Sequence, residues 1–345
     1  MTCRSMVLRI CLAGAAASSL LIASAASVTG VIAGRTLAGV FAACVPVAQP
    51  GATDILSGNQ TALGLSRVSA AAQLGIVVGP VVSAIFQGRF AAMGLPSALC
   101  LPAVFVAAAV FALGVLAQMA FIEKRPLRIG ATDEAMKPQM EEASEHGVGM
   151  AQPVLRTITI VIGWTAIPSN SIYGLFAPRF LGFQQPQLSA TYSVAAILMV
   201  TTQLVFPRLF AKTGEHRACS LGILASGVGI GCLALIHCQP LHTVFYMLNR
   251  AGAAVADTST ATLVARSSCS KEARSRNLAL LTSTRAAARI VTPLLSGKMF
   301  EWSCSSVMAP GALPFVAAAC CAVAVAPLPV LLLRAEQRAH QSSQP

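Results

Sequence analysis

Residues 311–333 read GALPFVAAACCAVAVAPLPVLLL, and no Asp, Glu, Lys or Arg occurs between Glu301 and Arg334. A helix needs about 20 apolar residues to cross a bilayer core of roughly 30 Å, and this stretch supplies them. The pattern predicts a membrane-spanning segment. Three further stretches lack the same charged residues, between Arg67 and Arg89, between Arg89 and Glu123, and between Arg217 and Arg250.

The composition points to a membrane protein built from helices. Hydrophobic residues make up 55% of the chain and charged residues only 10%, whereas a soluble domain carries about 25% charged residues. Isolated strands in lipid would leave their backbone groups unpaired, and the period-two alternation of a membrane barrel is absent. We therefore predict an all-α, polytopic transmembrane helical bundle.

The apolar stretches predict about ten spans, divided by one polar linker. The linker has mixed charge and no helical periodicity, which is typical of a solvated, flexible segment. The predicted domains are an N-terminal bundle of four spans at 1–122, a cytoplasmic linker at 123–152, a six-helix bundle at 153–334 and a cytoplasmic tail at 335–345. The predicted spans are 7–30, 33–50, 68–88, 98–121, 153–176, 187–207, 218–237, 242–265, 277–297 and 311–333.

The first span has a second interpretation. Arg4 and Arg9 precede an apolar run that ends in Ala23-Ser24-Ala25-Ala26, a pattern that also resembles a cleavable signal peptide. The internal repeat described below favours a helix that is retained.

The net charge of +12 reflects orientation in the membrane. Basic residues gather in the loops on one side, which the positive-inside rule identifies as cytoplasmic. No interleaving of aromatic and basic residues suggests nucleic-acid binding, so the predicted partner surface is the lipid bilayer. The side with few bases carries Arg89, Arg179 and Lys298, and the cytoplasmic side carries Arg67, Arg208, Lys212, Arg217, Arg266, Lys271, Arg274, Arg276, Arg334 and Arg338.

An internal repeat relates the two parts of the chain. Landmarks in the first part recur in the second at nearly one offset, which predicts two parallel halves. In the register of a six-helix half, the first span is the third helix, so two helices would be missing at the front. The pairs are Arg4 with Arg217, Arg35 with Arg250, and Pro80 with Pro293, at offsets of 213, 215 and 213 residues.

The repeated landmarks carry a family resemblance. The segment Gly34-Arg35-Thr36-Leu37-Ala38-Gly39, followed by Asp54 and by Gly75-Ile76-Val77-Val78-Gly79-Pro80, resembles the fourth and fifth helices of the major facilitator superfamily. The likeness is greatest to its drug:proton antiporter branch, which includes tetracycline efflux proteins. The run from Arg208 through Gly214 to Arg217 resembles the family's cytoplasmic loop between helices eight and nine, and 270–297 resembles the run into its eleventh helix.

The chain departs from the family pattern at two places. The antiporter motif usually closes with two glycines, where this chain has Ser83-Ala84. The first-helix acid that many proton-coupled members use has no counterpart here. The resemblance is therefore specific for the superfamily and carries little information on the substrate.

The resemblance implies gating or structural roles for several residues. Gly75 and Gly79 lie four apart on one helix face, where they would let another helix approach closely, and Pro80 would kink the span. Ordinary helix packing explains the two glycines as well. Asp54 would be a gate or a loop anchor at the cytoplasmic end, and Arg208, Gly214 and Arg217 would form the loop motif.

Arg35 near the outer end of its span has two interpretations. Its long side chain could extend to the membrane interface. It could instead face a central cavity and assist substrate binding or proton coupling, as the resemblance implies.

Asp257 is the acid predicted to lie deep in a span, where a charge is costly and is usually paired or functional. Arg250 and Asp257 share one helix face, and Arg285 and Arg289 share a face of the next span. We predict a cavity lined by these four residues, in which the surplus of bases favours an anionic substrate or substrate group. The alternative is a structural ion pair between Asp257 and one of the arginines.

No pattern of enzyme chemistry is present. The 11 cysteines form no CxxC pair, and no metal spacing, phosphate-binding glycine loop or nucleophile elbow occurs. His237 and His242 flank a short outer loop and are expected at the surface. The sequence predicts neither cofactor nor metal.

The predicted function is secondary active transport by alternating access, with efflux of a small organic solute by antiport and protons as the coupling ion. A different class remains open: a non-transporting or degenerate membrane fragment, or an interaction partner of a full-length relative. The chain is predicted to be an integral, multi-pass protein of a plasma or organellar membrane.

Overall fold

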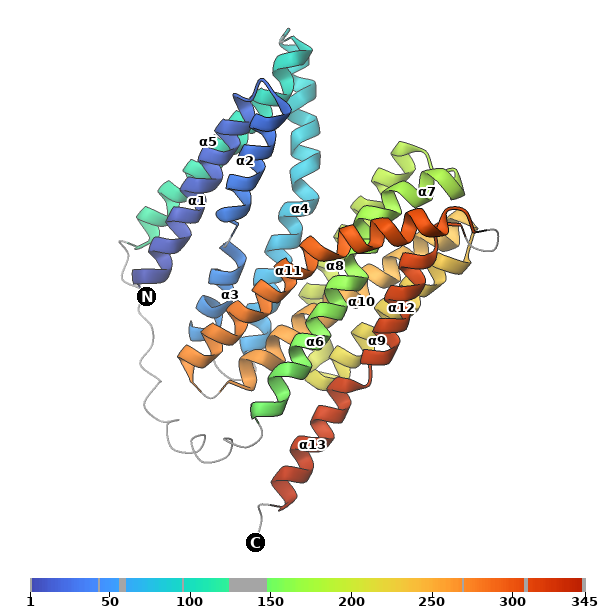
Figure 1. The fold of residues 1–345 in the computed structure, drawn as a ribbon. Coiled ribbons are helices and arrows are strands. Elements are labelled where there is room, and N and C mark those ends of the chain that lie inside the picture. Colours follow the sequence, from blue (N-terminus) through green and yellow to red (C-terminus); the bar gives the residue numbers. More distant parts are fainter. Residues whose placement is uncertain are drawn as a thin grey trace. The chain divides into compact units, whose positions relative to one another are not determined.

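A computed structural model describes residues 2–42, 44–55, 60–94, 96–123, 148–268, 270–306 and 310–342, and within these ranges every regular element is a helix (Figure 1). The predicted all-α class is therefore confirmed. The chain divides into two compact units. Unit 1 comprises Met1–Gly51 and Gly75–Gln139, and unit 2 comprises Ala52–Leu74 and Met140–Pro345.

Unit 1 is built from helices near the N-terminus. The helix α1 packs against α2 and α5. Ser27 caps α2, because its hydroxyl accepts a hydrogen bond of 3.2 Å from the backbone nitrogen of Gly30. The ring of Phe41 occupies the space that a Cβ of Gly14 would need, so α1 requires glycine there. The helices are α1 (Thr2–Ala23), α2 (Val28–Val40), α3 (Cys44–Ile55) as far as Gly51, α4 (Gln60–Ala92) from Gly75, and α5 (Ser97–Glu123).

Unit 2 holds most of the chain, and α9 and α10 run side by side at its centre (Figure 1). Both α8 and α11 also pack against α10. The first part of α4 belongs to this unit, where Leu65 is buried among residues of α6, α9, α10 and α11. The other helices are α6 (Val148–Ile167), the π-helical turn η1 (Pro168–Ile172), α7 (Tyr173–Leu181), α8 (Gln185–Thr213), α9 (Glu215–Leu235), α10 (Gln239–Arg266), α11 (Lys271–Ser303), α12 (Leu313–Val325) and α13 (Leu328–Ser342).

Glycines bring α9 and α10 into backbone contact. A Cβ added at Gly222 would lie 2.7 Å from the backbone nitrogen of Ala256, and one at Gly252 would lie 2.5 Å from that of Ser226. No side chain fits at these points, so the two helix backbones touch directly. Small residues permit such contact between membrane helices, and van der Waals packing then holds them together.

The helices follow the predicted spans with four interruptions. The first predicted span, 7–30, is broken between Ala23 at the end of α1 and Val28 at the start of α2. The second predicted span, 33–50, is broken after α2 at Phe41, and the tenth is broken between α12 and α13 at Pro327. The fifth changes to a π-helical turn at Pro168. Proline removes a backbone donor, which explains the last two positions. Hydropathy alone locates the apolar stretch and not the continuity of the helix within it.

Six helical stretches in the described residues are long and apolar enough to cross a membrane by length and composition alone. They are formed by α1, by α2 with α3, by α5, by α8, by α9, and by α12 with α13. The remaining long helices, among them α10 and α11, carry polar side chains that lower their average hydropathy. Those two helices position the candidate site.

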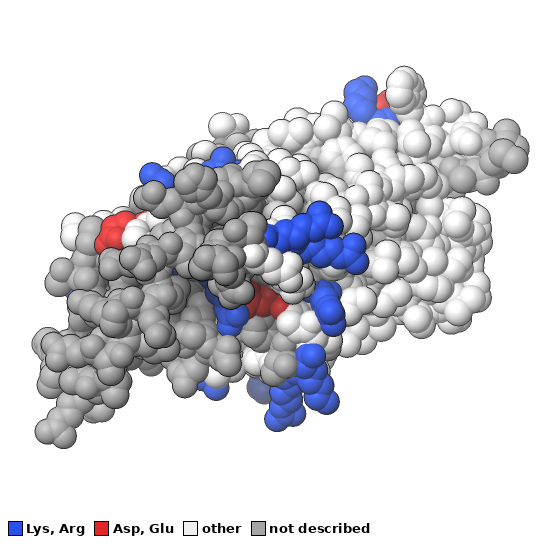
Figure 2. All heavy atoms as spheres, turned by 90° about the horizontal axis from the view of Figure 1, so that it is seen from below, with Lys and Arg blue, Asp and Glu red and all other residues white. Residues whose placement is uncertain are grey.

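The predicted linker at 123–152 lies largely outside the described residues, because 124–147 are not described. The predicted domain boundaries therefore stay predictions. At the ends of the unit 2 helices that the sequence places in the cytoplasm, the exposed bases include Arg208, Arg217 and Arg266. In Figure 2, the blue atoms of Lys and Arg cover more of the visible described surface than the red atoms of Asp and Glu.

Candidate functional site

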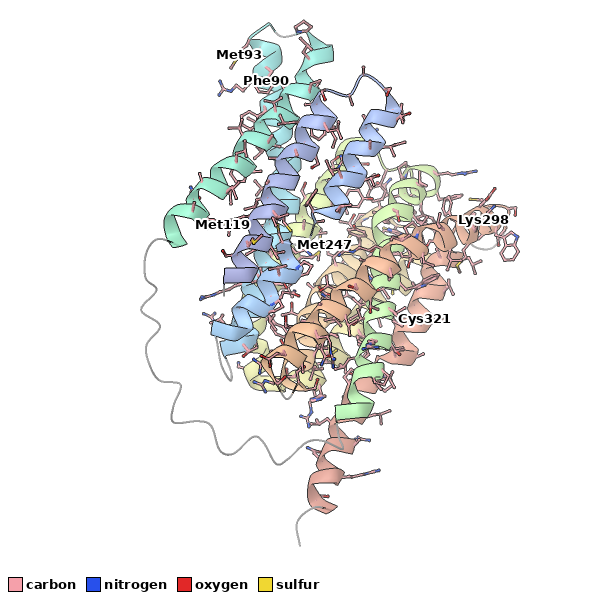
Figure 3. The ribbon with its side chains drawn as sticks, turned by 60° about the vertical axis from the view of Figure 1, so that its left-hand side comes forward. Phe90, Met93, Met119, Met247, Lys298 and Cys321 are labelled. Carbon is pink, nitrogen blue, oxygen red and sulfur yellow. The ribbon has the colours of Figure 1, made fainter. Side chains whose placement is uncertain are left out.

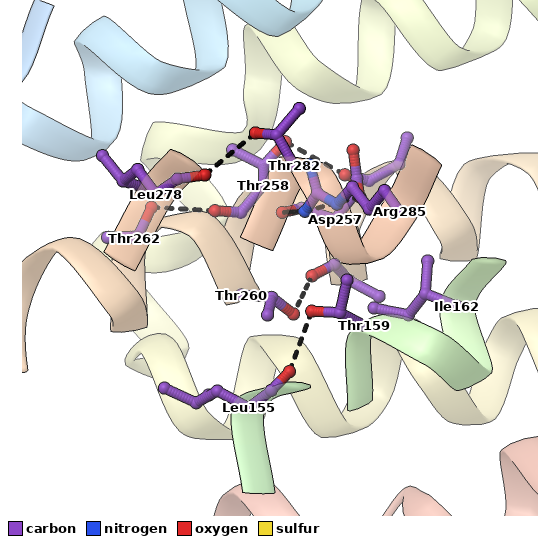
Figure 4. A network of polar contacts seen from close by, with 12 residues as sticks. Leu155, Thr159, Ile162, Asp257, Thr258, Thr260, Thr262, Leu278, Thr282 and Arg285 are labelled. Carbon is purple, nitrogen blue, oxygen red and sulfur yellow. Dashed lines mark hydrogen bonds and ion pairs between the residues drawn. The ribbon is translucent and has the colours of Figure 1, made fainter. Parts of the chain in front are cut away.

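Asp257 and Arg285 form an ion pair that joins α10 to α11 (Figure 4). Nη2 of Arg285 lies 2.7 Å from Oδ1 of Asp257 and donates a second hydrogen bond of 3.1 Å to the Asp257 backbone carbonyl. The exposed fractions are 14% for the Arg285 side chain and 30% for that of Asp257. The ion pair that the sequence left as an alternative is therefore present, and its base is Arg285.

Hydroxyl side chains lie near the ion pair, but they donate their hydrogen bonds to backbone carbonyls. Thr258 donates to the carbonyl of Ala254 over 3.0 Å, and Thr262 donates to the carbonyl of Thr258 over 2.9 Å (Figure 4). Ser and Thr in helices commonly bond to a carbonyl one turn back. These hydroxyl protons are thus occupied within α10, and the charge of Asp257 is balanced by Arg285.

Arg250 lies near this pair without an acid of its own. It is partly buried, and its Nη1 atom is shielded from solvent and has no hydrogen-bond partner in the described part of the chain. Its guanidinium interacts electrostatically with Arg289, Asp257, Tyr192 and Tyr246. The structure thus brings together the bases and the acid that the sequence assigned to one cavity, with three positive charges and one negative.

Arg289 follows Arg285 by one turn of α11 and is exposed. No salt bridge to Arg289 or Arg250 occurs among the described residues. Glu215 and Glu301, acids described elsewhere in unit 2, pair with other bases. The local surplus of two positive charges is therefore uncompensated within the described part of unit 2.

The three tyrosines of the chain pack together, and two of them, Tyr192 and Tyr246, interact electrostatically with Arg250. The rings of Tyr173 and Tyr246 stack at 4.5 Å between centroids, and Tyr192 packs edge-on against Tyr246 at 5.7 Å. Tyr173 and Tyr246 are fully buried, whereas Tyr192 is partly exposed. The sequence analysis missed this cluster. The i, i+4 spacing of Tyr246 and Arg250 was the available signal, since it places both on one helix face.

His242 corrects the expectation of a surface histidine. Its side chain is 0% exposed, while His237 is exposed as expected. The ring stacks on Tyr173, with its Nε2 atom 2.9 Å from the Leu233 carbonyl and its Nδ1 atom 3.3 Å from the Tyr173 hydroxyl. A carbonyl only accepts, so Nε2 carries the proton and Nδ1 accepts from Tyr173. Burial follows because α10 begins at Gln239 and already packs at His242.

In unit 1, Arg35 lies on α2 and is exposed. Its guanidinium carbon lies 6.0 Å from the ring centroid of Phe105 in α5, at the outer limit of a cation–π contact. Both interpretations of Arg35, at the interface or at a cavity, stay predictions.

The close helix approach predicted at Gly75 and Gly79 is not found in the described part of the chain. A Cβ added at either glycine would have no described atom within 4 Å apart from those of its own helix. The helix α4 continues through Pro80 to Ala92. The structural roles of Gly75 and Gly79 stay predictions, whereas glycines of α9 and α10 do permit close helix approach. The side chains of Pro80 and Asp54 lie outside the described residues.

The loop between α8 and α9 consists of one residue, Gly214. Gly214 has a φ of 77°, a left-handed conformation that favours glycine, and α9 begins at the next residue. Arg208 and Arg217 are exposed on either side. Glu215 is buried and pairs with Arg266, a contact that the sequence analysis did not predict. An acid in the first turn of a helix after glycine was the signal for it.

A family model described as Major Facilitator Superfamily matches residues 2–293. This chain belongs to the Major Facilitator Superfamily. It is accordingly an integral, multi-pass membrane protein of a family of solute transporters rather than of enzymes.

One relative of this major facilitator protein matches over part of its length. The chain is 26% identical over 196 residues to Multidrug resistance protein 2 of Bacillus subtilis (strain 168). This alignment covers 56% of the chain and 48% of the relative, so the chain spans about half the length of that protein.

Solved structures share the fold of this major facilitator protein. The human organic anion transporter MFSD10 (TETRAN) matches with a TM-score of 0.70 and 18% identity, over 96% of this chain and 77% of that one. FucP in the outward conformation matches with a TM-score of 0.71 and 9% identity, over 94% of this chain and 83% of that one. The Escherichia coli fucose:proton symporter FucP matches at 0.67 and 9%, over 94% and 84%. At these identities the likeness shows the fold alone.

Proposed function

We propose that this protein is a secondary active transporter that exports a small organic solute in exchange for protons by alternating access. The observation that carries the proposal is the group of Arg250, Asp257, Arg285 and Arg289 on two packed helices. Ionisable residues within membrane helices are costly and typically mark solute or proton pathways. Membership of a transporter family and the similarity to a multidrug resistance protein support the same function.

The depth of the charged group suits a transport site. Arg250 lies eleven residues after the start of α10 at Gln239, and Asp257 lies nine residues before its end at Arg266. At a rise of 1.5 Å per residue, these are roughly 16 Å and 14 Å from the two helix ends. Both side chains therefore project from the middle of the helix, the depth at which transporters bind their solutes.

Asp257 supplies a coupling group for protons. As a carboxylate it holds Arg285 at 2.7 Å. Protonation of Asp257 removes the negative charge and releases the guanidinium of Arg285. A proton on Asp257 and a solute bound elsewhere in the same charged group, taken up in turn, would be exchanged across the membrane, which is the requirement for antiport.

The proposal is tested on the purified full chain reconstituted in liposomes that contain a pH-sensitive dye. With an imposed pH gradient, small organic anions, cations and neutral solutes are added one at a time. We expect at least one class to move protons, and Asp257→Asn to abolish that movement. Lys298→Gln is the control, because Lys298 lies at the end of α11 (Figure 3) and its side chain is 83% exposed.

Two results would overturn the proposal. One is the absence of solute-driven proton movement for every class from a protein shown to be folded, which would favour the non-transporting alternative. The other is full proton movement in Asp257→Asn, which would remove the ion pair from the mechanism.

A further inference from the structure

The candidate site contains more positive charge than unit 2 neutralises. Arg285 uses the charge of Asp257 at 2.7 Å. Arg250 and Arg289 have no acid within salt-bridge distance among the described residues. Their mutual electrostatic interaction is repulsive. Since uncompensated charge is costly in the middle of a membrane helix, an anion between them would lower the free energy of the site.

The Arg250 guanidinium is available for such an anion. Its Nη1 atom is shielded from solvent and lacks a hydrogen-bond partner in the described part of the chain. Arginine presents a planar set of donors that matches a carboxylate in two parallel hydrogen bonds. Tyr192 and Tyr246 interact electrostatically with Arg250 but supply no negative charge while protonated.

Tyr192 places an aromatic surface next to the free guanidinium. It is the partly exposed member of the tyrosine cluster, and Tyr246 packs edge-on against it at 5.7 Å. Tyr173 packs against the same ring at 6.1 Å. Two buried rings therefore hold Tyr192 in place and leave part of it open. Aromatic pairs contribute beyond the area that they bury, so a ligand ring would gain by packing there.

The depth of Arg250 distinguishes a solute from a lipid headgroup. Arg250 lies eleven residues into α10, which is roughly 16 Å from the helix end, whereas headgroups lie outside a hydrocarbon core of about 30 Å. An anionic headgroup would have to enter the middle of the bilayer. A free organic anion that reaches the site from water has no such restriction.

We propose that the transported solute is an aromatic carboxylate whose acidic group is neutralised by Arg250 and Arg289 and whose ring packs on Tyr192. This inference rests on the proposed function and assigns a substrate class to the same site. It adds a role for Tyr192, and it separates Arg250 and Arg289, which bind the solute, from the Asp257–Arg285 pair, which carries the proton.

Binding of 4-nitrobenzoate to the purified full chain tests the proposal. The protein is placed in nanodiscs of neutral phosphatidylcholine, so that no anionic headgroup competes, and binding is measured by equilibrium dialysis. The uncharged 4-nitrobenzamide and the cation benzylammonium serve as matched probes. We expect 4-nitrobenzoate to bind at least about 10-fold more tightly than either, because a hydrogen bond to a charged group is stronger than a neutral one.

The variants locate the site. We expect Arg250→Gln and Arg289→Gln each to weaken 4-nitrobenzoate binding by roughly 10- to 100-fold, and Tyr192→Leu to weaken it by roughly 3- to 10-fold. Lys298→Gln removes an exposed positive charge from the same helix as Arg289 and should leave binding unchanged. Arg250→Lys keeps the charge without the planar fork, so it should bind several-fold more weakly than the native chain even if Arg250→Gln fails to fold.

The inferred binding site and the proposed antiport can each be contradicted independently, because binding and proton movement are measured in separate experiments. Equal affinity for 4-nitrobenzoate and 4-nitrobenzamide, or native affinity in folded Arg250→Gln and Arg289→Gln, would overturn the inference while leaving transport of another solute class intact. Arginine-dependent binding of 4-nitrobenzoate without proton movement in liposomes would support the site and overturn the proposed antiport.

Discussion

The backbone nitrogen of Asn249 in α10 would lie 2.5 Å from a Cβ added to Gly229 in α9. Real Cβ atoms do not approach a backbone atom this closely, so alanine at this position would force the two helices apart. We expect Gly229→Ala to lower the stability of the folded protein by about 2 kcal/mol, the usual range for overpacking. The measurement is thermal unfolding of the purified protein in detergent.

Gly297 provides the matched control for that experiment. It lies within α11, and a Cβ there would have no described atom within 4 Å beyond its own helix. Gly297→Ala should therefore be neutral or slightly stabilising, since alanine is the better helix former. Equal destabilisation by the two substitutions would contradict the backbone contact.

Removing one charge of the Asp257–Arg285 ion pair should lower the stability of the protein, and removing both charges should cost less than the two single losses added together. Asp257→Asn leaves the Arg285 guanidinium without its anion, and Arg285→Gln leaves the carboxylate without its cation. We expect each single variant to lose about 2 kcal/mol, less than the 3–5 kcal/mol typical of a fully buried pair, because both side chains keep some solvent contact. The double variant should be more stable than the sum of the two losses predicts.

A double-mutant cycle on thermal unfolding measures that coupling. The matched control is the Lys298–Glu301 pair, which joins two exposed side chains at the end of α11 at 3.3 Å. Its cycle should give a coupling energy near zero, as exposed pairs commonly do. Strict additivity at Asp257 and Arg285 would mean that the pair contributes nothing to folding.

The two histidines should respond differently to the same substitution. His242→Phe keeps an aromatic ring at a fully buried position but removes the partners of the Tyr173 hydroxyl and the Leu233 carbonyl. Leaving a buried polar group unsatisfied costs about 1–3 kcal/mol, so we expect a marked fall in the unfolding temperature. His237→Phe, at an exposed position, should produce little change.

Tyr173→Phe separates the two hydrogen bonds of His242. It removes only the bond to Nδ1 and leaves the one to Leu233, so we expect about half the effect of His242→Phe on unfolding. An unaltered unfolding temperature in both variants would argue against the buried histidine.

The orientation of unit 2 predicts which cysteines are accessible from outside the cell. Cys238 is exposed in the loop before α10, on the side that carries few bases. A membrane-impermeant maleimide should label it in intact cells that display the protein at the surface. Cys238→Ser should reduce that labelling, and Cys238→Ser with Cys304→Ser should remove it from this end of unit 2, because the partly exposed Cys304 follows α11 there. A cysteine introduced as Arg217→Cys, at the other end of α9, should be labelled only after permeabilisation. The reverse pattern would invert the topology.

The sequence predicted the fold well because membrane helices are constrained by one simple requirement, an uncharged stretch long enough to cross the bilayer. For α5, the predicted span 98–121 and the observed Ser97–Glu123 nearly coincide. For α11, the predicted 277–297 is shorter than Lys271–Ser303, because a helix continues past its apolar part into water. Hydropathy indicates which part of a helix lies in the lipid, whereas backbone hydrogen bonding determines the residue at which the helix ends.

The candidate site was predicted only as a set of residues. Helical spacing placed Arg250 and Asp257 on one face, but the pairing of Asp257 with Arg285 depends on how α10 and α11 pack, which no local pattern encodes. Tyr192 and Tyr173 belong to other helices, so their convergence on Tyr246 is a tertiary property as well. The backbone contact at Gly229 was missed for the same reason, since no family motif contains this glycine.

The backbone contact between α9 and α10 also restricts how unit 2 can move. Helices separated by long side chains slide past one another by small rotamer changes, but two backbones in direct contact have no such layer between them. The helices α9 and α10 must then move together as one rigid body, so Arg250 and Asp257 of α10 move with α9. Changes in the shape of unit 2 are thereby confined to helix interfaces that are filled by side chains. The interface between α10 and α11, which the Asp257–Arg285 pair crosses, is one of them.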